Sequence, residues 1–348
     1  MATVRLGQRQ KTHDIRRFIL RGVADSSNGI AARTADEFGL AIATVNGHVR
    51  ALVAEGNLLS EGRTRSRIYR LPILEQNTFT IPLDKPQDES DVWERLVAPR
   101  LRNVRSNVQA VCQHGFTEML NNAIDHSESP IAQVTVTRNA VNIDLVVSDS
   151  GIGIFQKIAD SLNLESPQQS LIELAKGKVT TDPDRHSGEG IFFTSRMFHR
   201  FAILSGSLLF DHDPNSDWLI EQESGRVRRG THVFMTIDTE SELTTAEVFD
   251  RFTSERQEYG FTKTHVPVRM MLHEGDRLVS RSQARRLLSR VDRFSKVMLD
   301  FSGVDEIGQA FADEIFRVFA RSNPEIELVP LKASQAVRNM IRRARNAD

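Results

Sequence analysis

The stretch that decides the fold of this chain is DSGIGI, residues 149–154. The residues just before it, IDLVV at 143–147, alternate as a β-strand does. The pattern therefore predicts a strand that ends in an aspartate, Asp149, and is followed at once by two glycines.

Two further stretches fit this one in order and in spacing. EMLNNA, residues 118–123, places Glu118 and Asn122 four positions apart in a predicted helix, so both side chains project from one face. SGEGI, residues 187–191, places a second glycine pair where another helix is predicted to begin. Such a set can hold an adenine ring, a metal ion and a triphosphate. The order of the three stretches is more informative than any one of them alone.

Length and composition are those of an ordinary globular protein. A chain of 348 residues predicts two or three domains, and 39% hydrophobic with 26% charged residues fits that class. The single cysteine, Cys112, cannot form an internal disulfide. We expect it to lie in a helix, buried in the protein core rather than acting as a nucleophile. No apolar run approaches the ~20 residues of a membrane span, and no signal-peptide pattern begins the sequence. We therefore expect a cytoplasmic protein that does not enter a membrane.

Residues 1–72 form a basic segment. They hold 12 Arg and Lys residues against 6 Asp and Glu residues, whereas the whole chain has a net charge of −1. This asymmetry of charge suggests a segment that contacts phosphate groups. The apolar spacing predicts three helices and then two short strands, over residues 12–24, 31–38, 43–55, 58–59 and 68–71.

Three helices followed by a basic hairpin resemble a winged helix-turn-helix. The third helix could then lie in a major groove of double-stranded DNA, and the arginine-rich turn could contact phosphate or the minor groove. The candidate DNA-binding residues are Thr44, Asn46, His48, Arg50, Arg63, Arg65 and Arg67. A small winged domain used for protein contacts is the alternative.

The chain between 73 and 91, with its prolines and the run DKPQDESD at 84–91, is predicted to be a linker. The residues that follow, roughly 92–240, resemble the GHKL superfamily of ATPases, which includes gyrase and the histidine kinases. The matching positions are Glu118, Asn122 and Ala123, then Asp149, Gly151, Gly153 and Ile154, then Gly188, Gly190 and Ile191, and finally Gly230 and Thr231. Four boxes in this order predict the α/β sandwich of that superfamily.

The resemblance implies an ATP site with defined roles. Asp149 would accept a hydrogen bond from the adenine amino group, and Thr231 would support the adenine. Gly151 and Gly153 would let the backbone approach the nucleoside without a Cβ in the way.

The phosphate end of the site follows from the same resemblance. Asn122 would coordinate Mg²⁺, shared with the phosphates. Gly188 and Gly190 would leave backbone N–H groups at a helix start, where phosphate binds well. Glu118 corresponds to the general base that orients the attacking water in the hydrolytic members.

Residues 155–187 would form a lid over the nucleotide. Lys176, Lys178 and Arg185 could neutralise phosphates, or they could be solvated charges of the lid. His186, beside the second glycine pair, is a further candidate for phosphate contact. A histidine kinase fits poorly because no His-Glu-x-x-x-Pro helix precedes the ATP domain.

Residues 258–348 alternate strands and helices, which predicts a separate α/β domain. LDFSGV, residues 299–304, resembles the STAS domains of anti-sigma factor antagonists and, more closely, the STAS-like domain family of unknown function. The helix start after this strand, GQAF at 308–311, has no Ser or Thr, so we expect no phosphorylation switch there. The domain could bind a protein partner or its own ATP domain, or could serve for dimerisation.

The sequence thus predicts a multidomain α/β protein: a winged helix-turn-helix, a GHKL sandwich and a STAS-like domain. Our first hypothesis is a transcription regulator that binds ATP and Mg²⁺, hydrolyses ATP, and binds DNA differently when the lid closes. The second is a serine/threonine protein kinase of the anti-sigma type, acting on a protein partner. The third is a nucleotide-gated interaction protein with little turnover. GHKL relatives often dimerise, so a homodimer is an open possibility.

Overall fold

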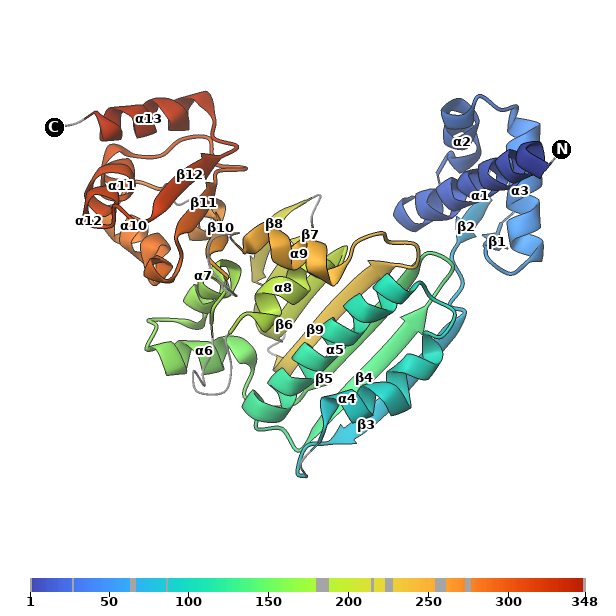
Figure 1. Ribbon diagram of the computed structural model, residues 1–348, viewed down its shortest axis with the longest axis horizontal. Helices are drawn as coiled ribbons and strands as arrows, with labels where there is room; N and C mark the ends of the chain where they lie inside the picture. The colour runs from blue at the N-terminus through green and yellow to red at the C-terminus, as the bar shows by residue number, and fades with distance from the viewer. Residues whose placement is uncertain are drawn as a thin grey trace.

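The computed structural model describes residues 2–26, 28–62, 67–85, 87–179, 188–213, 216–222, 228–253, 261–272 and 277–346. Over these residues the chain is a mixed α/β structure with three sheets. Figure 1 shows a large central lobe, with a smaller helical lobe at the N-terminal end and an α/β lobe at the C-terminal end.

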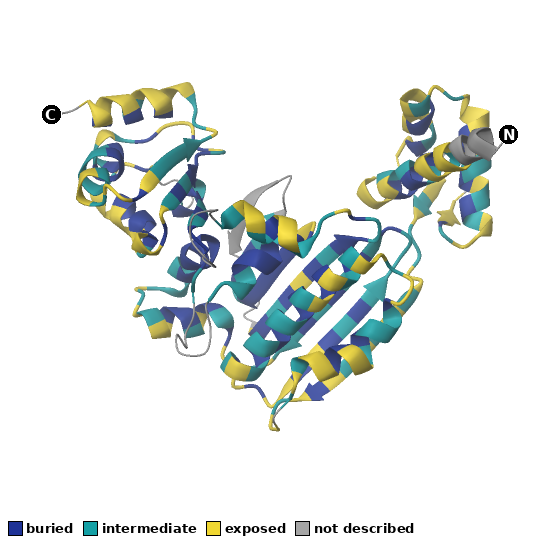
Figure 2. Cartoon of the chain, in the orientation of Figure 1, coloured by how far each residue is buried: buried dark blue, intermediate teal, exposed yellow. Residues whose placement is uncertain are grey.

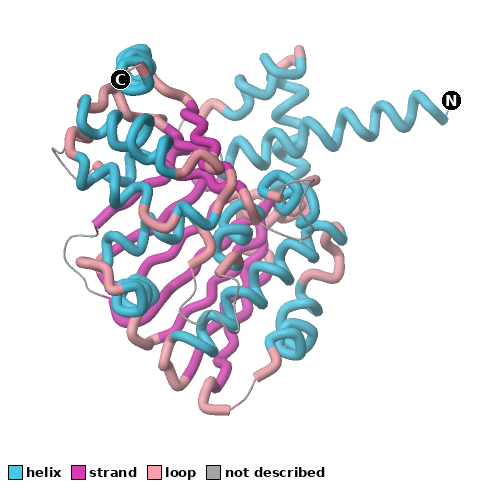
Figure 3. The backbone as a smooth tube through the Cα atoms, turned by 60° about the vertical axis from the view of Figure 1, so that its left-hand side comes forward, coloured by secondary structure: helices cyan, strands magenta, loops and turns pink. Residues whose placement is uncertain are grey.

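The N-terminal lobe has the predicted order of three helices and two strands. Its elements are α1 (Ala2–Asp25), α2 (Ile30–Phe38), α3 (Ile42–Ala54), β1 (Leu59–Glu61) and β2 (Ile68–Arg70). Their apolar faces bury Ile19, Val45 and Leu52 in a small core of their own. Helix α1 begins ten residues earlier than predicted. The prediction missed its first turns because they lack the apolar stripe that marks the rest of the helix. Figure 3 shows this part of α1 extending away from the body of the molecule.

The predicted linker over 73–91 is wrong for most of its length. Residues Glu75–Pro82 form β3, which pairs antiparallel with β4 (Ile131–Arg138) along its whole length. Phe79 and Ile81 alternate with threonines, which is the strand pattern that the prolines obscured. Pro82 is tolerated because β3 is an edge strand, where a missing N–H leaves no ladder bond unmade. The central lobe therefore begins near residue 75 rather than at 92.

The central lobe is built on a seven-stranded antiparallel sheet in the order β3-β4-β5-β9-β6-β7-β8. Its remaining strands are β5 (Asn142–Asp149), β6 (Arg200–Gly206), β7 (Leu208–Asp213), β8 (Ser216–Gln222) and β9 (Arg228–Asp238). Val134 and Val147 pair across β4 and β5 and are buried on the same face. Helix α5 (Ser106–His126) lies across that face, with its buried side toward the strands (Figure 2).

Further short helices complete the central lobe. They are α4 (Glu89–Val92), a π-helical turn (Trp93–Val97), a 3₁₀ turn (Ala98–Arg100), α6 (Ile154–Leu162), α7 (Pro167–Lys176), α8 (Gly190–Met197) and α9 (Thr245–Phe252). Helix α8 packs on α5, and α9 packs on α8. Cys112 is fully buried within α5, as predicted.

The C-terminal lobe is a three-stranded parallel sheet covered by helices. The strands, in sheet order, are β10 (Lys263–Pro267), β11 (Lys296–Asp300) and β12 (Glu327–Leu331). The helices are α10 (Arg281–Leu288), α11 (Gln309–Asp313), a π-helical segment (Glu314–Phe319), α12 (Ala320–Ser322) and α13 (Gln335–Arg345), with 3₁₀ turns at Val268–Met271 and Val291–Arg293. The predicted strand at 265–272 ends at Pro267, because the chain continues into the first of these turns.

The three lobes are joined in two different ways. One apolar core runs without interruption from the central lobe into the C-terminal lobe, through Phe192, Phe261 and Phe294. The N-terminal lobe has its own core, which takes in Val141 from the turn after β4. Among the described residues, no helix combines the length and the apolar composition that crossing a bilayer requires.

Candidate functional site

The residues predicted to form a site converge on one cavity of about 260 Å³ in the central lobe. Its walls come from α5, the end of β5, the start of α6, the end of α7, the start of α8 and β9. The predicted residues that line it are Glu118, Asn122, Asp149, Gly153, Ile154, Gly188, Gly190 and Thr231. Two glycines of the matching positions, Gly151 and Gly230, do not line it.

Helix α5 supplies Glu118 and Asn122. Phe116 and Leu120 on the opposite side of the helix are fully buried, so helical geometry turns Glu118 and Asn122 outward together. Glu118 also meets the second glycine pair, because a Cβ on Gly190 would lie 1.9 Å from its Oε2. The missing side chain at Gly190 therefore makes the space that this carboxylate occupies.

The carboxylate of Asp149 is held by two backbone N–H groups, one from the turn that follows β5 and one from β9. Gly151 N–H donates to Asp149 Oδ1 at 2.8 Å, and Thr231 N–H donates to the same oxygen at 3.3 Å. Burial raises the pKa of Asp149, while these backbone hydrogen bonds oppose that rise. The orientation of this acceptor is thus fixed before any ligand arrives.

The first glycine pair, Gly151 and Gly153, lies against neighbouring protein atoms. A Cβ on Gly151 would lie 1.8 Å from the backbone oxygen of Ser127, and Ile152 N–H donates to that oxygen at 3.0 Å. A Cβ on Gly153 would meet Ser205 Oγ at 2.5 Å, and its φ is +86°. Both glycines therefore admit neighbouring protein atoms, and Gly153 also lines the cavity, so a role for them beside a nucleoside stays a prediction.

Thr231 closes the same corner of the cavity. Ile154 N–H donates to Thr231 Oγ1 at 3.0 Å, which ties the start of α6 to β9. Gly230, just before it, has a φ of +79°, and a Cβ there would lie 2.0 Å from the backbone oxygen of Asp149. Glycine is needed at this position because the chain approaches β5 so closely.

The second glycine pair begins α8. Gly188 has a φ of +72°, and its carbonyl accepts a hydrogen bond from Val179 N–H at 3.0 Å. Helix α8 starts at Gly190, so the predicted helix start is confirmed. Ser187, His186 and Arg185 lie outside the described residues.

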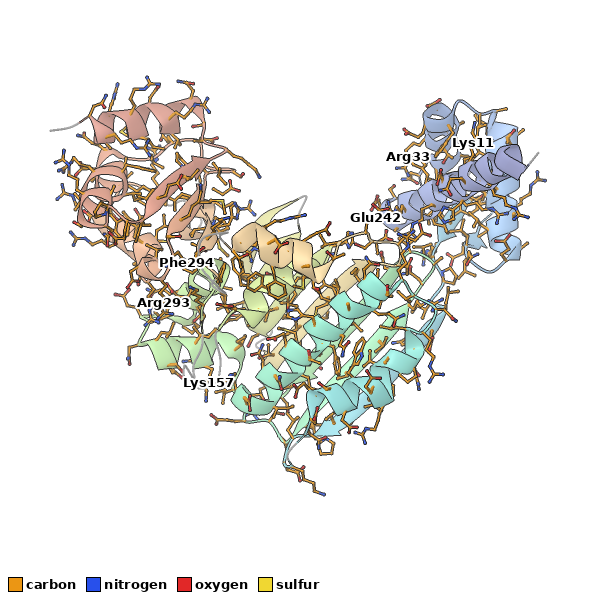
Figure 4. The ribbon with its side chains drawn as sticks, viewed as in Figure 1. Lys11, Arg33, Lys157, Glu242, Arg293 and Phe294 are labelled. Carbon is orange, nitrogen blue, oxygen red and sulfur yellow. The ribbon has the colours of Figure 1, made fainter. Side chains whose placement is uncertain are left out.

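Several lining residues were not predicted individually, although those between 157 and 179 fall within the predicted lid at 155–187. His126, Ser127, Lys157, Ile158, Leu174 and Val179 also face the cavity. Lys157, labelled in Figure 4, pairs with Glu128 at 2.8 Å. Lys157 and Ile158 share one face of α6 with the predicted Ile154 at helical spacing, and that signal could have found them.

The position of Lys176 contradicts both predictions made for it. It was expected either to neutralise phosphates or to be solvated, yet its side chain is 1% exposed. It does not line the cavity but points into the C-terminal lobe, where it donates to the backbone oxygen of Ser289 at 2.7 Å. Lys178 also turns to that lobe, over the rings of Phe261 and Phe294.

The candidate DNA-binding residues are distributed over α3 and the turn before β2. Thr44, Asn46 and Arg50 are exposed, whereas His48 is half-buried. Burial, and then the nearby Arg16, lower the pKa of His48, which favours its neutral form. Arg67 is exposed beside β2, and Arg63 and Arg65 lie outside the described residues.

Comparison with known proteins bears on the C-terminal lobe. Residues 283–338 match the model of the STAS-like domain of unknown function (DUF4325). The C-terminal lobe therefore carries a STAS-like domain. The match runs from α10 through β11 and β12 into α13, as the resemblance of residues 299–304 predicted. No curated protein matches the chain.

Proposed function

We propose that this chain is an ATP-binding and ATP-hydrolysing regulator that binds DNA through its N-terminal lobe. The observation that carries the proposal is the convergence of four separate sequence boxes on one cavity. A carboxylate and an amide from α5, an aspartate from β5, a threonine from β9 and a glycine-started α8 all reach it. Random surface residues from four elements would not converge in this way, whereas a ligand with a base and phosphates needs all of them.

Asp149 is suited to recognise the base. Its Oδ1 is occupied by two backbone amides, so the carboxylate presents a fixed acceptor to an amino group at the edge of adenine. A purine with a carbonyl in place of that amino group would meet the carboxylate oxygen with its own oxygen. The site thereby favours adenine over hypoxanthine and guanine.

Asn122 and Glu118 are suited to the phosphate end. Mg²⁺ keeps several waters and is commonly held by one or two protein oxygens together with substrate phosphates. The described residues contain no cluster of three His, Cys, Asp or Glu side chains that would hold a metal alone, so one amide plus phosphates fits the donor set. When bound, the ion would neutralise phosphate charge. Glu118, one helical turn away, would orient and deprotonate the attacking water.

The N-terminal lobe is connected to this cavity by β9. Thr231 lies near one end of the strand at the cavity, and Asp238 lies at the other end, about 23 Å away at 3.3 Å per residue. Asp238 forms ion pairs with the buried Arg17 and with Arg21 of α1, and Glu240 contacts His13 at 3.0 Å. A nucleotide that favours one position of β9 would also favour one position of α1. It can shift that equilibrium only by its differential affinity for the two states.

A protein serine/threonine kinase is the second candidate. The observation in its favour is the STAS-like domain in the same chain, because a kinase of the anti-sigma type acts on a partner of that class. Glu118 would then take the proton of a protein hydroxyl rather than of water.

Incubation with ATP labelled on the γ-phosphate separates these functions. Release of free labelled phosphate supports the ATPase, whereas label on this chain or on an added protein supports the kinase. Glu118→Gln is the matched control and should abolish either transfer while nucleotide binding remains. Intact ATP after prolonged incubation of a chain that binds it would leave only a nucleotide-gated interaction protein.

DNA binding is tested separately. Exchanging Asn46 and Arg50 on α3 for alanine should lower the affinity for duplex DNA, and exchanging Arg63, Arg65 and Arg67 should also reduce its dependence on salt. A matched control exchanges the exposed Arg102 of the central lobe for alanine. Unchanged DNA affinity in both sets of variants would assign the winged lobe to protein contacts.

A further inference from the structure

The end of α7 is fastened to the STAS-like domain by a buried lysine. Lys176 Nζ donates to Glu173 Oε1 at 2.8 Å, to Ser289 O at 2.7 Å and to Arg286 O at 3.3 Å. An ammonium has three donors, and these contacts use all of them. The two carbonyls belong to the last turn and the C-cap of α10, so a side chain from the central lobe caps a helix of the C-terminal lobe.

Burial makes this contact costly unless it is complete. The Lys176 side chain is 1% exposed and that of Glu173 is 7% exposed. Burial lowers the pKa of Lys176, and Glu173 opposes that shift. A buried charge that loses its partners is strongly unfavourable, so α7 and α10 hold one relative position while the contact lasts.

The residues that follow Lys176 reinforce the same junction. Thr264 Oγ1 of β10 donates to Lys176 O at 2.6 Å, and Gly177 leaves no room for a Cβ between the rings of Phe192 and Phe261. Lys178 Nζ then donates to Arg293 O at 3.1 Å, and Arg293 Nη1 returns a bond to Lys178 O at 2.7 Å. Figure 4 labels Arg293 and Phe294 where the C-terminal lobe meets α7.

This fastened segment is also a wall of the central cavity. Leu174, two residues before Lys176, lines the cavity, and so does Val179, three residues after it. Val179 N–H in turn donates to Gly188 O in the second glycine pair. The segment 174–179 therefore lines the cavity on one side and contacts the STAS-like domain on the other.

From this geometry we infer that the STAS-like domain sets the position of residues 174–179 and thereby the nucleotide affinity of the cavity. Lys176 is the positioning residue, since it acts through Leu174 and Val179 and does not reach the cavity itself. The inference rests on the proposed nucleotide site. Coupling of this kind is reciprocal, so nucleotide bound in the cavity must also stabilise the junction with α10.

Two measurements on the full chain test the inference. The first is calorimetric titration of wild type and Lys176→Met with a non-hydrolysable ATP analogue and Mg²⁺. We expect the affinity of the variant to fall by about tenfold, within the 5- to 150-fold range of typical coupling between sites. Lys296→Met is the matched control, because Lys296 forms an exposed ion pair with Glu327 in the same lobe. The control should bind as wild type does.

The second measurement uses the unaltered protein, so it does not depend on the folding of a variant. Hydrogen exchange is followed at residues 281–294, none of which lines the cavity. Nucleotide should slow exchange there, because it stabilises the segment on which α10 is capped. A role for Lys176 in stability alone would leave this exchange unchanged.

The outcomes separate the inference from the proposed function. If the wild-type chain binds the analogue but residues 281–294 exchange as before and a folded Lys176→Met variant binds equally well, the coupling is refuted and the nucleotide site stands. If the wild-type chain binds no analogue, the nucleotide site itself is refuted.

Discussion

Replacing Asp149 with asparagine should reverse the base preference of the cavity. Oδ1 of Asp149 accepts hydrogen bonds from the backbone amides of Gly151 and Thr231 at 2.8 and 3.3 Å. In Asp149→Asn these amides require an acceptor, so the asparagine must keep its carbonyl oxygen there. Its NH₂ group then takes the place of Oδ2. The variant therefore presents a donor where the wild type presents an acceptor.

The size of the effect follows from that exchange. The amino group of adenine would lose a hydrogen bond to a charged acceptor, worth about 1.5–3 kcal/mol, and would face another donor. At 1.4 kcal/mol per factor of ten, we expect ATP affinity to fall by about 10- to 150-fold. Inosine triphosphate carries a carbonyl at the same position of the purine, so its affinity should rise relative to ATP.

Calorimetry with ATP and inosine triphosphate, each with Mg²⁺, measures both changes on one preparation. Circular dichroism of the variant controls for folding, since both backbone amides keep an acceptor. Asp149→Asn that binds ATP as tightly as wild type, with no gain for inosine triphosphate, would refute the assignment of Asp149 to the base. Loss of both nucleotides to the same extent would point to a structural role instead.

Three other predictions concern catalysis, the lobe junction and pH. Glu118→Gln should lower kcat for ATP hydrolysis by about 10²- to 10⁴-fold with little change in nucleotide affinity, and unchanged turnover would exclude Glu118 as the base. Asp238→Asn should weaken docking of the N-terminal lobe by up to about 3 kcal/mol, because the buried Arg17 would then keep Glu240 as its one acidic partner among the described residues; proteolysis between the lobes should accelerate. Burial, with Arg196 nearby, lowers the pKa of His212 to about 2, whereas the unfolded chain takes up that proton near 6.5. The free energy of unfolding should therefore fall as the pH is lowered from 6.5 toward 2, by up to about 1.4 kcal/mol per pH unit. In His212→Gln, the free energy of unfolding measured in urea should depend correspondingly less on pH.

The local pattern of the sequence predicted much of the cavity. The spacing of Glu118 and Asn122 fixes their shared helix face, because side-chain direction in a helix depends only on position. Asp149 could be placed at a strand end from alternation alone. These are short-range properties, and they hold in the folded chain.

Long-range packing could not be predicted in this way. Lys176 was predicted to be a charge of the lid because the sequence does not show its partners, two carbonyls at the end of α10 that lie more than a hundred residues away in the chain. Gly151 was predicted to leave space for a ligand because nothing in the sequence places the carbonyl of Ser127 against it. The strand at Glu75–Pro82 was hidden by prolines that an edge position tolerates.

Binding of an adenine nucleotide by the central lobe is the claim on which the account depends. Isothermal titration of the purified 348-residue chain with ATP and excess Mg²⁺ tests it most directly. The account predicts saturable heat with one nucleotide per chain, and markedly weaker binding of inosine triphosphate. A titration in which the folded protein takes up no ATP would contradict it.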